Sequence, residues 1–204
     1  MQPLVHDHRR GPTLDRMAEG WFATDDDDEV DEAQQAVLDV LRARASSDHW
    51  PMIDPADTSV EFPGTYNYGY PLQPGETSFG KVLAWLDVPD PERRSSLLTV
   101  GVYFTETDMR GDCLHNQMLT LPAEPTHLAV IQAGTSQQMA HRAAGWFLDI
   151  LRRPIVRYEW LRAGRVYAHR CLFADSGHGL VEGRVRTGEL GPPDRRIHVR
   201  GDQP

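Results

Sequence analysis

Lysine and cysteine are both scarce in this chain. Lys81 is the only lysine among 21 basic residues, and the 204 residues include two cysteines. Two cysteines far apart in sequence cannot form a disulfide scaffold, so we expect reduced thiols and a cytoplasmic protein. We interpret the preference for arginine as the coding bias of a G+C-rich, bacterial genome.

Long apolar runs are absent as well. No window approaches the roughly 18 consecutive apolar residues of a membrane helix, so we expect no membrane partner. Residues 1–16 carry charges but lack the apolar centre of a secretory signal, and we expect none there. The remaining composition, 40% hydrophobic and 25% charged, is typical of a globular protein with a buried core.

Charge is distributed unevenly along the chain. Residues 1–100 carry 19 acidic and 8 basic side chains, whereas residues 101–204 carry 11 acidic and 13 basic ones, for a net charge of −9. This balance excludes a uniformly basic nucleic-acid-binding protein. Opposite charges in the two halves should attract each other or a second copy of the chain, which favours a protein partner or self-association.

Three regions follow from the composition. Residues 1–29 are poor in apolar side chains, end in an acidic run and are predicted to be mostly disordered. Trp21 and Phe22 are the exceptions there, and we expect them to dock. Residues 30–187 are predicted to form one α+β domain, and the proline- and arginine-rich residues 188–204 a flexible tail.

Apolar spacing predicts two main helices, over residues 30–45 and from a cap at Thr135 or Ser136 to residue 153. Residues 46–80 are rich in proline and glycine and are predicted to be irregular. Strands are predicted at 82–88, 98–104, 113–121, 126–132, 155–161, 165–173 and 180–185. These elements predict a mixed or mainly antiparallel sheet of about five to six strands with the two helices on one face. The strand, helix and strand of 126–161 fit a right-handed crossover.

Both cysteines lie in short pairs with histidine, in mirrored order: Cys113 with His115, and His169 with Cys171. A spacing of i, i+2 puts both side chains of a pair on one face of a strand. If the two strands are neighbours, the four side chains form a ligand set that zinc accepts. The spacing differs from that of common zinc ribbons and fingers, so zinc is a candidate here and no other cofactor is expected.

A catalytic thiol is the alternative for Cys113. Arg110 and His115 are placed to activate it, and Asp112 to orient the imidazole. No cysteine-hydrolase signature surrounds Cys113. The segment 175–179 has the residue types of a serine hydrolase but lacks the nucleophile elbow, and we interpret it as a turn. Whether the protein is an enzyme stays open at this point.

Two sets of residues are predicted to bind a partner. The first is Tyr66, Tyr68 and Tyr70, which alternate in a long loop and combine large rings with polar tips. The second is the arginine-rich hairpin 152–170, whose arginines are interleaved with Tyr158, Trp160 and Tyr167. From it Arg157, Arg162 and Arg165 are predicted to contact the partner.

Since every catalytic pattern is incomplete, the leading hypothesis is a non-catalytic protein-binding protein of accessory, regulatory or immunity-like type. A small metalloprotein or cysteine-dependent enzyme at the two Cys-His pairs is the first alternative. Because arginines interleaved with aromatic residues also suit single-stranded nucleic acid, a nucleic-acid-binding protein acting through the hairpin is the second.

Overall fold

The computed structural model describes residues 20–25, 28–63, 81–92, 95–115, 119–183 and 185–202. In chain order its elements are α1 (Glu32–Ser47), the 3₁₀ helix η1 (Pro55–Asp57), β1 (Thr58–Glu61), β2 (Val82–Pro89), β3 (Ser96–Phe104), β4 (Asp108–Cys113), β5 (Val130–Ala133), α2 (Ser136–Arg152), β6 (Ile155–Arg162), β7 (Arg165–Phe173), β8 (Gly179–Glu182) and β9 (Arg195–Arg200). No helix in this part of the chain combines the length and apolar character needed to cross a bilayer.

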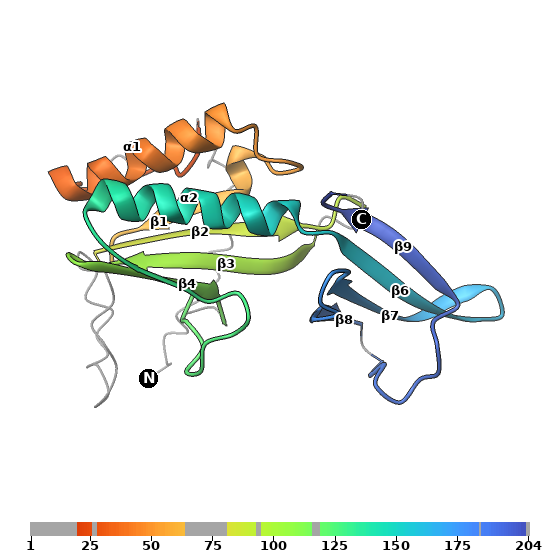
Figure 1. The fold of residues 1–204 in the computed structure, drawn as a ribbon. Coiled ribbons are helices and arrows are strands. Elements are labelled where there is room, and N and C mark those ends of the chain that lie inside the picture. The colour runs from red at the N-terminus through yellow and green to blue at the C-terminus, as the bar shows by residue number, and fades with distance from the viewer. Residues whose placement is uncertain are drawn as a thin grey trace, which may run out of the picture.

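The strands form two antiparallel sheets. The first has the order β1-β2-β3-β4-β5 and the second the order β8-β7-β6-β9. Figure 1 shows both helices lying over the five-stranded sheet, while the four-stranded sheet extends from one end of it. The predicted α+β class and antiparallel pairing are therefore confirmed. The strands are divided between two sheets, whereas a single sheet was predicted.

The predicted crossover between 126 and 161 is wrong because the strands on either side of α2 belong to different sheets. The first sheet contains β5, and the second contains β6. Only Arg153 and Pro154 separate α2 from β6, and the backbone of Arg153 is extended, with φ −61° and ψ 132°. Such a short extended link spans only about 7 Å and cannot return the chain across the first sheet. The second sheet therefore begins where α2 ends.

Each helix begins with a reciprocal capping box. In α1 the Asp31 carboxylate accepts from the N–H of Gln34 at 2.8 Å, and the Gln34 side chain accepts from the N–H of Asp31 at 2.7 Å. Thr135 and Gln138 make the same pair of bonds at the start of α2. These bonds satisfy N–H groups that have no partner inside a helix. The observed helix bounds lie within two residues of those predicted.

The main core fills the space between the helices and the first sheet. Phe22 is fully buried there, with its ring centroid 6.0 Å from that of Trp50 and 6.1 Å from that of Phe147. Its N–H donates to the hydroxyl of Thr58 at 3.0 Å, and Arg42 donates to its carbonyl oxygen at 2.8 Å. The predicted docking of Phe22 is confirmed, so part of the region assigned to a disordered segment belongs to the core.

Three strand predictions are wrong. A strand was predicted at 113–121, but the observed strand β4 covers Asp108–Cys113 and ends at the first residue of that range. Beyond it, an isolated bridge pairs His115 with Thr120. Strand β1 lies in the stretch predicted to be irregular. Strand β9 lies in the predicted flexible tail, where pairing with β6 holds a segment that has only two apolar residues.

The docking of Phe22 can be tested by unfolding. Replacing it by alanine removes a fully buried ring, and we expect Phe22→Ala to lower the free energy of unfolding by about 3–5 kcal/mol in urea titrations. The exposed Glu29 provides a control, since Glu29→Ala should change that energy by less than about 0.5 kcal/mol. Equal stability of the two variants would contradict this packing.

Candidate functional site

The first Cys-His pair forms at the end of β4. The sulfur of Cys113 lies 3.7 Å from Nε2 of His115. Burial raises the pKa of the Cys113 thiol, and the neighbouring Asp112 carboxylate raises it further. The thiol is therefore protonated at neutral pH, which is the opposite of what a nucleophilic cysteine needs. This environment does not support the predicted catalytic thiol.

Asp112 has a structural role in place of the predicted orienting one. It is 4% exposed and accepts from the N–H of Cys113 at 2.7 Å and from the N–H of Thr126 at 2.7 Å. The hydroxyl of Thr126 donates to the same carboxylate. These bonds hold the connection between β4 and β5 against the end of β4.

The second pair lies on β7, in the other sheet. Cys171 is 2% exposed and belongs to the hydrophobic core with Ile155 and Phe173. The ring of His169 lies against the backbone of Gly183. No three His, Cys, Asp or Glu side chains in the described part of the chain are arranged to hold a metal ion. The four predicted ligands therefore do not form a shared zinc site, because the fold puts the two pairs on different sheets.

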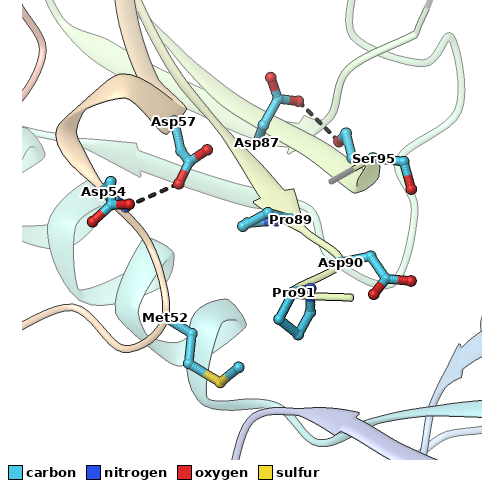
Figure 2. Close-up of a pocket in the computed structure, with 9 residues that line it drawn as sticks. Met52, Asp54, Asp57, Asp87, Pro89, Asp90, Pro91 and Ser95 are labelled. Carbon is cyan, nitrogen blue, oxygen red and sulfur yellow. Dashed lines mark hydrogen bonds between the residues drawn. The ribbon is translucent and has the colours of Figure 1, made fainter. Parts of the chain in front are cut away.

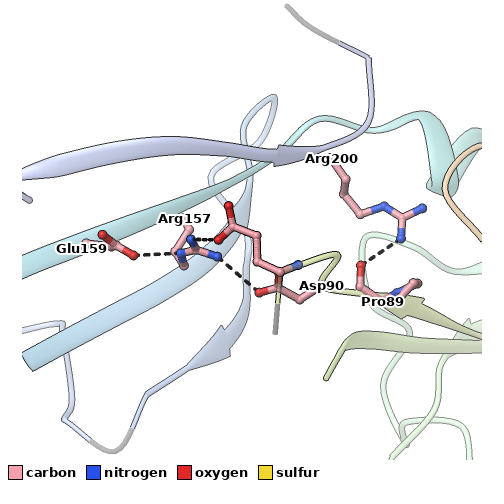
Figure 3. Close-up of polar contacts among 6 residues, drawn as sticks. Pro89, Asp90, Arg157, Glu159 and Arg200 are labelled. Carbon is pink, nitrogen blue, oxygen red and sulfur yellow. Dashed lines mark hydrogen bonds and ion pairs between the residues drawn. The ribbon is translucent and has the colours of Figure 1, made fainter. Parts of the chain in front are cut away.

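Arg157 is buried in a cluster of carboxylates. Its guanidinium group contacts Glu159 at 3.0 Å, Asp90 at 3.3 Å and Glu92 at 2.5 Å (Figure 3). The side chain of Arg157 is only 4% exposed. Burial alone would lower the pKa of Arg157. The hydrogen bonds that Arg157 donates to Glu92 and Glu159 have the larger combined effect and raise that pKa. The prediction that Arg157 binds a partner is wrong, since this side chain joins β6 to the connection between β2 and β3.

Arg200 makes a second link between the sheets, which sequence analysis did not predict. From β9 it donates to the carbonyl oxygen of Pro89 at 3.0 Å (Figure 3). It also donates to the carbonyl oxygen of Pro51 at 2.9 Å. It is 1% exposed, and burial lowers its pKa to about 10 while the charge of Asp57 opposes that shift. Arg200 therefore stays charged at neutral pH and ties the last strand to the first sheet.

A surface cleft of about 600 Å³ lies beside these links (Figure 2). Four of its nine lining residues are aspartates, and three of their carboxylates serve local structure. Asp57 accepts from the N–H of Asp54 at 2.9 Å, Asp87 accepts from the hydroxyl of Ser96 at 3.0 Å, and Asp90 pairs with Arg157. Because these groups already have partners in the chain, we assign no ligand to this cleft.

A polar cluster lies where the connection between β4 and β5 meets the turn between β7 and β8. Arg153 pairs with both carboxylate oxygens of Asp175, at 2.9 and 2.8 Å, and donates to the hydroxyl of Ser176 at 3.0 Å. The ring centroids of His127 and His178 are 3.7 Å apart. Asp175 and Ser176 are therefore bound to an arginine, and the described side chains in this cluster form no Ser-His-Asp relay. This geometry agrees with a turn.

Four exposed arginines gather on the second sheet: Arg162, Arg165, Arg195 and Arg196. We call them the arginine surface. Arg162 and Arg165 are cross-strand neighbours at the end of the β6–β7 hairpin, while Arg195 and Arg196 are the first residues of β9. None of the four forms an ion pair with another described residue. The strand predicted as a tail supplies half of this surface.

The tyrosines Tyr66, Tyr68 and Tyr70 fall outside the described residues, so their role in partner binding stays a prediction. Comparisons with known proteins do not add a candidate: no family model, no curated protein and no solved structure matches this chain.

The buried cluster around Arg157 makes a prediction for stability. Arg157→Met leaves the buried carboxylates of Asp90 and Glu159 without their shared cation, and we expect the free energy of unfolding to fall by about 3–5 kcal/mol. Chemical denaturation measures this change. Arg165→Met removes an exposed arginine from the neighbouring strand and should cost less than about 0.5 kcal/mol. A loss no larger than that of the control would refute the bridging role.

The histidine pair makes a prediction for pH. Burial lowers the pKa of His127 below 6.5, and the charges of His178 and Arg153 lower it further, while Asp112 and Asp175 oppose the shift. Because the folded state then holds this proton less tightly than the unfolded chain, stability falls as pH drops from 6.5 through the folded pKa.

Replacing His178 by glutamine removes one of the charges that oppose protonation of His127. We expect His178→Gln to raise the pKa of His127 towards its ordinary value, as followed by NMR titration of the ring protons. The matched variant His141→Gln changes a histidine on α2 and should leave the pKa of His127 unchanged. An unchanged or lower pKa in His178→Gln would show that the two rings are not coupled.

Proposed function

We propose that this protein is a non-catalytic binding protein whose arginine surface docks on an acidic partner protein. The observation that carries the proposal is a group of four exposed arginines without ion-pair partners in the described structure. Elsewhere the arginines of this sheet are used internally, as Arg157 and Arg200 show. Arg195 and Arg196 are adjacent in β9 and lie on opposite faces of the sheet, so the arginine surface covers both faces of its outer end. Unpaired like charges there are most favourable beside the carboxylates of a partner.

Position supports the same function. The four-stranded sheet extends from the body of the protein, so its outer end is open to a partner (Figure 1). Along β6 the pairing positions of the arginine surface run from Tyr158 to Arg162, a distance of about 13 Å. This backbone span is comparable with the Debye length of about 8 Å at physiological salt, so the potentials of charges at these positions overlap.

A protein partner is favoured over single-stranded nucleic acid because few aromatic faces are open. Trp160 is 8% exposed, and its indole N–H donates to the carbonyl oxygen of Gly191 at 2.8 Å. The guanidinium carbon of Arg162 lies 4.8 Å from the centroid of Tyr167 and occupies that ring. Stacking of bases needs free aromatic faces, and the net charge of −9 further disfavours a phosphate chain.

The test measures binding of a fluorescent poly-L-glutamate and of a single-stranded oligonucleotide of equal charge, by anisotropy over a salt series. We expect polyglutamate to bind, to bind more weakly as salt rises, and to lose affinity about tenfold or more in Arg195→Gln/Arg196→Gln and in Arg162→Gln/Arg165→Gln. The control Arg142→Gln/Arg152→Gln removes the same charge from exposed positions on α2 and should bind like the original protein.

Three other outcomes would contradict the proposal. Tighter binding of the oligonucleotide at equal salt would favour the nucleic-acid alternative. Equal losses in all three double variants would show a response to net charge without a specific surface. Absence of binding to polyglutamate at low salt would end the acidic-partner proposal.

A further inference from the structure

The backbone of β9 forms the longest open edge that the described strands offer. Four strands lie at sheet edges, and β1, β5 and β8 have four residues each, whereas β9 has six. Four consecutive residues of β9, Arg195–His198, are not buried, while Val199 and Arg200 are. In the described structure β9 pairs on one side only, with β6. Every second residue of such a strand turns its N–H and C=O groups away from its single partner. An extended peptide can bind these groups as an additional strand.

Positive side chains lie on both faces of this edge. Alternation puts Arg195 on one face, with Ile197, and Arg196 on the other, with His198. Arg195, Arg196 and His198 are exposed. Across the sheet Arg195 is paired with Glu159 and Arg196 with Tyr158. A strand added to β9 would therefore have an arginine beside it above and below the sheet.

These charges select the occupant. Two copies of β9 that paired edge to edge would put arginines opposite or diagonal to one another, and like charges across a strand pair are destabilising. A strand with carboxylates on both faces reverses the sign of that interaction. The same arginines that discourage pairing with a second copy thus favour an acidic strand.

We infer that the partner contributes an extended acidic segment, which adds to the free edge of β9 as a fifth strand of the second sheet. The inference rests on the proposed function and specifies its binding mode. Backbone hydrogen bonds hold the segment, and its carboxylates on alternate faces contact Arg195 and Arg196. This mode is β-strand addition, in which main-chain bonds supply affinity and side chains supply selectivity.

Two synthetic probes separate this mode from docking by charge alone. One is a terminally blocked peptide of repeated Glu-Glu-Val-Val, in which adjacent glutamates lie on opposite faces of a strand, and the other is the same peptide with every backbone nitrogen methylated. Methylation keeps the charges and removes the donors of a strand. We expect the first probe to bind at least about tenfold more tightly. By NMR hydrogen exchange, alternate amides of Arg195–Arg200 should gain protection, while the amides of the β5 edge should not.

A charge-reversal variant tests the role of the two arginines. Arg195→Glu/Arg196→Glu should lose the glutamate peptide and bind a blocked lysine–valine peptide, again with protection of alternate β9 amides. Retention of the original amide exchange pattern in the free variant shows that it folds.

The results distinguish the inference from the function on which it rests. If both probes bind equally and no β9 amide gains protection, strand addition is wrong while acidic-partner binding stands. If neither the peptide nor polyglutamate binds, both proposals fail. If the peptide protects β5 in place of β9, the assignment of the edge is wrong.

Discussion

The buried contact of Arg157 with Asp90 and Glu159 is the constraint on which the second sheet depends. Burying charges costs free energy unless they are paired, so this cluster is stable only when β6 lies against the connection between β2 and β3. Arg200 adds two bonds to backbone oxygens from the neighbouring strand. Together these two arginines fix where the second sheet attaches, and the outward position of the remaining arginines follows from that attachment.

This division of labour explains why one arginine-rich segment can have two different roles. Near α2, β6 and β9 lie beside the first sheet. There Arg157 pairs with buried carboxylates and Arg200 donates to backbone carbonyl groups. Towards the hairpin end, no part of the first sheet covers them, and Arg162 and Arg165 are exposed. The arginines of the four-stranded sheet are thus buried where it meets the first sheet and exposed at its outer end. Exposed charges at an outer end suit a binding surface better than a catalytic pocket.

Local features of the sequence were sufficient for the helices, because their signals lie within a few residues of each other. A cap at Thr135 marked the start of α2, and apolar spacing marked the buried faces of both helices. The β2–β3 and β6–β7 hairpins were also found from alternation. The α+β class followed from these elements.

The candidate site was harder to predict because it depends on contacts between distant segments. Mirrored spacing of Cys113–His115 and His169–Cys171 suggested one site, but spacing within a strand carries no information about which sheet the strand joins. Arg157 was predicted to bind a partner, and only its contacts with Asp90 and Glu92, from the connection between β2 and β3, show that it is internal. Strand β9 has too few apolar residues to show the alternation that predicts a strand. It is a strand because its backbone pairs with β6.

The reach of Arg200 has a consequence for how the chain matures. Its two bonds close over sequence separations of 111 and 149 residues. During synthesis, a nascent polypeptide that has already made the helices and the first sheet must therefore wait for its last strand before the second sheet is locked in place. Products that stop short of β9 would leave one side of β6 unpaired.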